Sequence, residues 1–181
     1  FPVMKRNNIN GIFYIPSMPI TKGRILSVHK IHLLIGKINF NQLKQIVEKN
    51  LSKKIINENE IKKFKNFTYR TQEKNEITKL KRILNYGLKS EYRTSFINKI
   101  FKYFFPTLNE KKFAKNYYLS ESDIKKLINN NMLIGAHSMS HQVLSMLRTN
   151  EFKDEIDKSL DFINQFTNLK LFSYPYGSKI S

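Results

Sequence analysis

Apolar residues recur along this chain in two patterns, which predict its helices and strands. Helical spacing, with apolar positions three and four residues apart, predicts helices over residues 25–35, 40–51, 77–88 and 95–105. Short runs of β-branched and aromatic residues predict buried strands over residues 11–16, 132–136 and 169–174. Residues 1–8 have the pattern of a helix end, 16–23 that of a loop, and 52–78 show no clear period. Together these patterns predict an α/β fold.

Two further helices are indicated by their first residues. Ser120 is followed three residues later by Asp123, a variant of the capping box, and this predicts a helix over residues 120–130. Asn150 predicts the start of the next helix. In that helix one apolar stripe is formed by Phe152, Ile156, Leu160 and Ile163.

Residues 132–174 therefore form a predicted strand–helix–strand unit, whose strands are expected to be parallel with a right-handed crossover. His137 follows the end of the first of these strands, and Pro175-Tyr176-Gly177 follows the end of the second. Ligand sites in parallel α/β folds form at this edge of the sheet. We therefore expect these two segments to be neighbours in space.

The length of 181 residues fits one domain, and no apolar run reaches the ~18 residues of a membrane span. The net charge of +18 is uneven: +6 over residues 1–40, +12 over 41–115 and zero over 116–181. A basic excess indicates either an anionic partner such as nucleic acid or simply a solvated, lysine-rich surface. The cluster Lys62-Lys63-Phe64-Lys65 has the same two interpretations, and the solvated surface is the simpler one.

The chain contains no cysteine, which excludes disulfides and thiolate metal sites. A metal would need His, Asp or Glu as ligands. The chain begins Phe1-Pro2-Val3 without a signal-peptide pattern. We therefore expect a fragment of a longer protein, and both a cytoplasmic and a cell-envelope location stay open.

Two pairs of histidines are candidates for chemistry. His137 and His141 are four residues apart, a spacing that lets both rings reach one ion, and Gly135 just before them allows close packing. Such a pair is also frequent on surfaces and in cores, so the spacing alone leaves both interpretations open. His29 and His32 either contact a substrate or are packing histidines, and we favour packing.

The segment from Leu133 to His141, Leu-Ile-Gly-Ala-His-Ser-Met-Ser-His, resembles the second motif of the polysaccharide deacetylases, the family built on the NodB homology domain. The segment from Phe172 to Gly177, Phe-Ser-Tyr-Pro-Tyr-Gly, resembles the third motif, Arg-x-Pro-Tyr-Gly, with Ser173 in the place of arginine. Residues 2–16 are similar to the family's stretch from its first helix into its second strand.

The resemblance implies an incomplete (β/α) barrel over residues 1–181, with a basic helical insertion at about 40–115. It implies a metal-dependent hydrolase that removes acetyl groups from an acetylated sugar of the bacterial surface. His137 and His141 would hold a divalent metal, Zn²⁺ first, with Co²⁺, Ni²⁺ or Mn²⁺ as alternatives. Pro175, Tyr176 and Gly177 would contact the substrate, and the main-chain N–H of Tyr176 would donate to the oxyanion.

The resemblance also implies that several groups lie outside this chain. The family's third metal ligand and its catalytic base are aspartates of an Asp-Asp-Gly motif that would precede Phe1. The catalytic acid is a histidine that would follow Ser181. The arginine replaced by Ser173 orients the catalytic aspartate in the family. We therefore expect an enzyme fragment, truncated at both ends and inactive alone.

The sequence also gives expectations for Ser138, Tyr174 and Tyr176. Ser138 is expected to tie the loop between the two histidines by hydrogen bonding to backbone. Tyr174 and Tyr176 are candidates for stacking on a sugar, and Tyr174 is expected to be partly core because it ends a strand.

The expected partner is an acetylated glycan, with no nucleic acid and no membrane span. The alternatives are a non-catalytic glycan-binding relative and a basic nucleic-acid-binding protein. The second alternative leaves the paired motifs unexplained.

Overall fold

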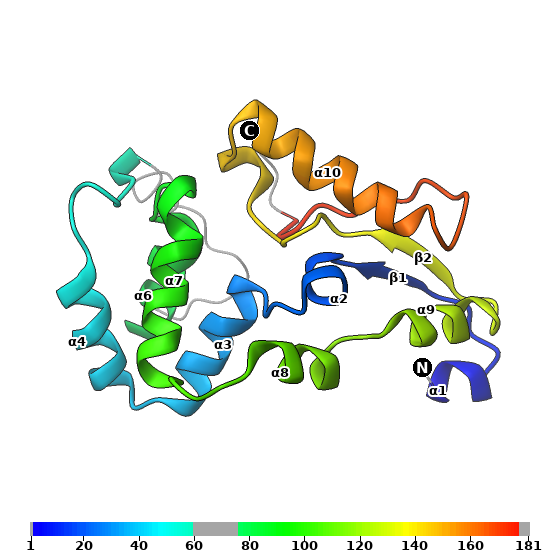
Figure 1. Ribbon diagram of the computed structural model, residues 1–181, viewed down its shortest axis with the longest axis horizontal. Helices are drawn as coiled ribbons and strands as arrows, with labels where there is room; N and C mark the ends of the chain where they lie inside the picture. The colour runs from blue at the N-terminus through cyan, green and yellow to red at the C-terminus, as the bar shows by residue number, and fades with distance from the viewer. Residues whose placement is uncertain (1, 60–75, 178–181) are drawn as a thin grey trace. The chain divides into compact units, whose positions relative to one another are not determined.

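The structure is a computed structural model that describes residues 2–59 and 76–177 (Figure 1). The chain forms two compact units, one from the residues up to 26 and from 109 onward, and one from residues 27–108. Helices combine with parallel strands, as the α/β prediction requires. The described residues form a two-stranded sheet, and they do not show the expected barrel.

The sheet of the first unit pairs β1 (Ile12–Ile15) with β2 (Leu133–Ala136). The strands are parallel, with Ile12 opposite Leu133 and Ile15 opposite Ala136. The strands predicted at 11–16 and 132–136 are thus confirmed, and so is the parallel order. Both strands are short, so this unit depends on the helices packed against the sheet for its stability.

The third predicted strand, at 169–174, is wrong in extent. Phe172 alone forms a parallel bridge, to Ala136. The Ala136 N–H donates to the Leu171 carbonyl at 2.8 Å, and the Ser173 N–H donates to the Ala136 carbonyl at 2.9 Å. A short apolar run indicates extended backbone, but not how many of its residues have a strand to pair with.

The two faces of the sheet differ in burial. Ile15, Ile134 and Ala136 lie in the core with residues of α9 (Glu121–Ile128) and α10 (Thr149–Ile163). On the other face, Ile12 is 46% and Tyr14 38% exposed, so β1 is not the fully buried strand that its composition predicts. Among the described residues, the core residues of α9 and α10 pack against the face of Ile15 and Ala136. Alternate side chains of a strand point to opposite faces, so Ile12 and Tyr14 point away from these helices.

The remaining elements of the first unit are short. They are α1 (Pro2–Arg6), α2 (Met18–Lys22), α8 (Glu110–Tyr117) and the 3₁₀-helix η1 (Leu144–Met146). The loop prediction for 16–23 is wrong because Pro19 sits in the first turn of α2, where a missing N–H costs nothing. Gly23 ends α2 with a φ of 59°, a conformation that glycine adopts without strain.

The helix starts test the capping predictions. Ser120 accepts from the Asp123 N–H and Asp123 accepts from the Ser120 N–H, so the predicted capping box is confirmed. The predicted cap at Asn150 is wrong, because α10 begins at Thr149 after Arg148. The Arg148 N–H donates to the Glu151 carboxylate at 3.1 Å, so a side chain of the first turn contacts the backbone of the residue before the helix.

The buried face of α10 differs from the predicted stripe. Of the predicted residues only Ile163 is fully buried, while Phe152, Ile156 and Leu160 are partly buried. The fully buried positions are Glu155, Ser159, Phe162 and Ile163. The apolar pattern misplaces this face because a buried carboxylate occupies part of it.

The second unit contains four described helices: α3 (Ser27–Lys37), α4 (Phe40–Asn50), α6 (Glu76–Tyr86) and α7 (Ser90–Phe104). All four were expected, although α7 begins earlier than predicted. Arg93 of α7 is buried, and it donates to the Leu84 carbonyl and to Asn85, both at 3.0 Å. A cation at the last carbonyls of α6 also suits the helix dipole, so Arg93 joins the two helices.

The predicted insertion at about 40–115 stays a prediction, although residues 27–108 do form a unit of helices. The Lys62-Lys63-Phe64-Lys65 cluster lies outside the described residues. Within residues 2–59 and 76–177, no helix combines the length and apolar character needed to cross a membrane.

Candidate metal and substrate site

His137 directly follows β2 and is held in a defined orientation. Its N–H donates to the Ile15 carbonyl at 3.2 Å, which extends the pairing of the two strands by one residue. Its ring Nδ1 lies 2.9 Å from the Ser173 carbonyl oxygen. A carbonyl oxygen only accepts, so Nδ1 must carry the proton. The lone pair of His137 is therefore on Nε2, the tautomer that suits a metal ligand.

The loop between the two histidines is tightly folded. Ser138 is fully buried, and its hydroxyl accepts from the His141 N–H at 3.0 Å, which confirms the predicted tie to backbone. Ser138 has a φ of 58° and His141 a φ of 56°, both in the left-handed region. Residues other than glycine adopt this region at a cost, so the surrounding contacts must hold the loop in place.

Glu155 of α10 provides many of those contacts. It is 3% exposed, and its carboxylate accepts from the Ser140 N–H at 2.8 Å and from the Ser140 hydroxyl. Its main-chain carbonyl accepts from the Met139 N–H at 3.0 Å. The other side of the loop is held by the Met18 N–H, which donates to the Met139 carbonyl at 2.9 Å.

The sequence analysis did not identify Glu155. A signal was present, since helical spacing places Glu155 on the same face as Phe152, Ser159 and Phe162. A carboxylate on such a face needs a hydrogen-bonding partner, because burying an unpaired charge is strongly unfavourable. That partner is the loop after β2, 15 residues away along the chain.

The rings of His137 and His141 lie close enough to share one ion. Their centres are 4.8 Å apart, with an angle of 73° between the planes. Two imidazoles that bind one tetrahedral ion at about 2.0–2.1 Å have ring centres roughly 5 Å apart. The donor set therefore fits a borderline metal such as Zn²⁺. Within the part of the chain that the structure describes, no third His, Asp or Glu joins this pair.

The predicted substrate segment forms a turn beside the histidines. The Gly177 N–H donates to the Tyr174 carbonyl at 3.3 Å, and Tyr176 has a φ of 67°. Pro175 at the second position and a positive φ at the third position, Tyr176, match a type II turn. The turn is closed by the Gly177 N–H and not by that of Tyr176, the group expected to meet an oxyanion.

The expected proximity of the two segments is confirmed. The ring of Tyr176 lies 5.0 Å from that of His141, and Ser173 contacts His137. Pro175, the second residue of the turn, is buried. Tyr174 is 62% exposed, so the prediction that it is partly core is wrong. The reason is that the chain has already left the sheet at Tyr174, whose ring contacts Phe172 at 5.2 Å between centres.

The other histidine pair belongs to the second unit. His29 and His32 lie on α3 with ring centres 6.2 Å apart. Burial, and then the neighbouring His32, lower the pKa of His29, while burial and Lys81 lower the pKa of His32. Both histidines therefore favour the neutral form. His29 is partly buried and His32 is exposed, and their role as packing residues stays a prediction.

A comparison with known protein families finds a match for part of this chain. Residues 94–180 match the family model described as polysaccharide deacetylase. The match supports a polysaccharide deacetylase family domain over these residues. No curated protein and no solved structure matches the chain. The matched residues include α9, β2 and α10. They also include His137, His141 and the Pro175-Tyr176-Gly177 turn.

Proposed function

We propose that this deacetylase domain is part of a metal-dependent hydrolase that removes acetyl groups from an acetylated glycan, with His137 and His141 as metal ligands. One observation carries the proposal. The Ser173 carbonyl fixes the tautomer of His137, so Nε2 is the ligating atom, and Ser173 belongs to the same segment as the predicted substrate turn. In this proposal, one hydrogen bond therefore links a metal ligand to the segment that contacts the substrate.

The residues of this site have distinct roles in the proposed reaction. A bound divalent ion supplies Lewis-acid polarisation of the acetyl carbonyl and lowers the pKa of a water molecule. His137 and His141 hold the ion at the end of β2. The Tyr176 main-chain N–H donates to the oxygen that gains negative charge, a contact that strengthens as the charge develops. Pro175 and Gly177 shape the turn that presents this N–H.

The proposal assigns the remaining groups to other parts of the protein. A third ligand, a base to take the proton of water and an acid to protonate the leaving group are all needed for the complete reaction. By family resemblance, aspartates supply the third ligand and the base, and a late histidine supplies the acid. We therefore expect residues 1–181 to bind metal weakly and to release no acetate on their own.

The test is acetate release by the full-length protein from N-acetylated and O-acetylated oligosaccharides, with and without added metal. We expect release that a chelator stops and Zn²⁺ restores, and that His137→Ala or His141→Ala reduces at least 100-fold, about 2.7 kcal/mol. His29→Ala and His32→Ala are matched controls that should retain activity. Glycan binding with metal bound and no acetate released would favour the non-catalytic relative instead.

A further inference from the structure

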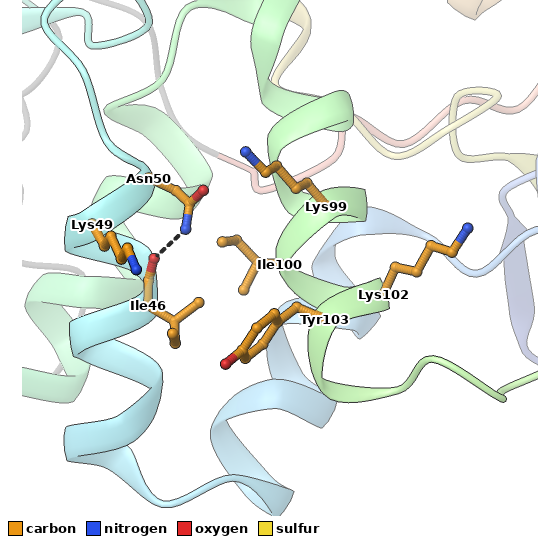
Figure 2. A pocket seen from close by; sticks show the side chains of 7 residues that line it. All are labelled: Ile46, Lys49, Asn50, Lys99, Ile100, Lys102 and Tyr103. Atoms are coloured by element: carbon orange, nitrogen blue, oxygen red, sulfur yellow. Dashed lines mark hydrogen bonds between the residues drawn. The ribbon is translucent and has the colours of Figure 1, made fainter.

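A cavity in the second unit lies between α4 and α7. Its volume is about 450 Å³, within the usual range of small-ligand sites. Figure 2 shows the residues around it, with α4 on one side and α7 on the other. They are Ile46, Lys49, Asn50, Lys99, Ile100, Lys102 and Tyr103. We call this cavity the basic pocket.

The basic pocket combines an apolar wall with an aromatic ring. Ile46 of α4 and Ile100 of α7 point toward one another across it (Figure 2). The ring of Tyr103 lies beside them, and Tyr103 as a whole is 60% exposed. An exposed tyrosine next to an apolar wall offers a flat surface for the apolar face of a ring-shaped ligand while its hydroxyl stays hydrated.

Positive charge surrounds this apolar wall. Lys49 comes from α4 and Lys99 from α7, while the ammonium group of Lys102 points away from the pocket in Figure 2. Among the described residues, none of these three lysines forms an ion pair. By contrast, Lys44 on the same helix as Lys49 lies 2.8 Å from Glu76. The pocket thus concentrates charge that no carboxylate of the described chain neutralises.

The surrounding unit increases this potential. Its described residues, 27–59 and 76–108, contain thirteen Lys and Arg residues against four Glu residues and no Asp, a net charge of +9. The carboxylate nearest in sequence, that of Glu48, belongs to an exposed residue of α4 that does not line the pocket. A concave site of one charge sign raises the local concentration of ligands of opposite charge.

We propose that the basic pocket binds a sugar phosphate monoester. Lys49 and Lys99 come from opposite walls, and the phosphate group would bind between them. A phosphate monoester carries a charge of about −1.5 to −2 at pH 7, so it matches two ammonium groups better than a carboxylate would. Tyr103 and the isoleucine wall receive the sugar ring. The ligand is either a free sugar phosphate or a phosphorylated unit of a glycan. This proposal does not depend on the proposed deacetylation.

The test is a titration of the protein with glucose 6-phosphate, glucose and inorganic phosphate, followed through the methyl NMR signals of Ile46 and Ile100. We expect glucose 6-phosphate to shift both signals at lower concentration than either fragment. A glycan bearing 6-phosphate groups, compared with the dephosphorylated glycan, distinguishes the polymer from the free ester as the source.

Matched variants make the result specific. The double variant Lys49→Gln/Lys99→Gln should weaken glucose 6-phosphate binding about tenfold or more, at least 1.4 kcal/mol. Lys125→Gln/Lys153→Gln removes the same charge from exposed positions of α9 and α10 and should change binding little. Tyr103→Leu should weaken binding of glucose 6-phosphate but not of phosphate.

Three results would overturn the proposal: unshifted Ile46 and Ile100 signals, equal loss in both double variants, or inorganic phosphate binding as tightly as the ester. Tighter binding of a single-stranded oligonucleotide at the same signals would also overturn it, in favour of nucleic acid.

Discussion

At the scale of single residues, the site depends on groups that orient one another. Ser173 fixes the ring of His137, Ser138 fixes the backbone of His141, and Glu155 fixes the loop between them. The hydrogen bond of Ser138 could be predicted from its position between the two histidines, whereas the role of His137 and His141 as metal ligands follows from the resemblance and stays a prediction. It did not reveal Glu155, whose partner Ser140 becomes a neighbour only when α10 packs on β2.

Glu155 should therefore affect metal binding without touching the metal. Replacing it by alanine leaves the Ser140 N–H without this acceptor, which should lower the free energy of unfolding by about 1–3 kcal/mol. Loss of a group that positions metal ligands typically weakens metal affinity about 10–100-fold. Calorimetric titration with Zn²⁺ measures this affinity.

Two variants separate positioning from general stability. Glu155→Gln keeps one acceptor oxygen and should restore part of the Zn²⁺ affinity. Asp157→Ala removes an exposed carboxylate from the same helix and should leave the affinity unchanged. If Glu155→Ala lowered stability while Zn²⁺ bound with wild-type affinity, Glu155 would be a structural residue only.

At the scale of elements, the sequence predicted the helices of the second unit and the parallel pair of strands, but not the extent of the third strand, the start of α10 or the existence of α2. The capping box of Ser120 and Asp123 is complete within four residues of sequence, so it could be predicted. The extent of pairing at Phe172 depends on a strand far away in sequence, and α2 was hidden by a proline that looks like a loop signal. Short α8 carries too few apolar residues to show a helical stripe.

The capping box should make α9 sensitive to acid. The Ser120 hydroxyl and N–H, and then Lys126, lower the pKa of Asp123 to about 2. A lowered pKa means that the stabilisation is present above the ordinary aspartate pKa of about 3.9 and is lost as the pH falls toward 2. Ser120→Ala should cost about 0.5–2 kcal/mol at neutral pH.

Urea unfolding at fixed pH values between pH 5 and pH 2 measures the stability that the capping box contributes. The method is suitable because residues of α9 belong to the core of the first unit, so loss of the cap lowers the stability of that unit. The stability lost by Ser120→Ala should shrink as the pH falls through the Asp123 titration. Ser145→Ala, at an exposed position of η1 outside the cap, is the control. A constant difference between Ser120→Ala and wild type at all pH values would show that the box contributes nothing through Asp123.

At the scale of the whole molecule, the two units differ in charge. Residues 27–108 carry a net +12, whereas the rest of the chain carries +6, from fourteen basic and eight acidic residues. The deacetylase match begins within α7 of the second unit. It continues over residues 109–180 of the first unit, which hold both motif segments. Composition alone left the role of the basic excess open. Three of its residues, Lys49, Lys99 and Lys102, line the pocket between α4 and α7.

The second unit should lose stability as the pH falls below neutral. The pKa values of His29 and His32 are both lowered in the folded unit, so its stabilisation is complete above the unfolded pKa of about 6.5 and is lost as the pH falls below it. Each protonation also adds charge to a unit that is already basic. Native-state hydrogen exchange of α3 and α7, corrected for the intrinsic pH dependence, should show lower opening free energies at pH 5.5 than at pH 7.5.

The variant His29→Asn/His32→Gln should remove that pH dependence from α3 and α7, because neither replacement titrates in this range. Exchange in α10, which belongs to the other unit, serves as the internal reference. Equal pH dependence in the variant and the wild type would mean that other groups destabilise α3 in acid.

The central claim is that His137 and His141 hold one metal ion, His137 through Nε2. The most direct test is ¹⁵N NMR of the four histidine side chains during titration with Zn²⁺. We predict a protonated Nδ1 on His137 before zinc, and a zinc-dependent shift of its Nε2 together with a ring nitrogen of His141, while His29 and His32 stay unchanged. Zinc at Nδ1 of His137, or no response of this pair at saturating zinc, would contradict the account.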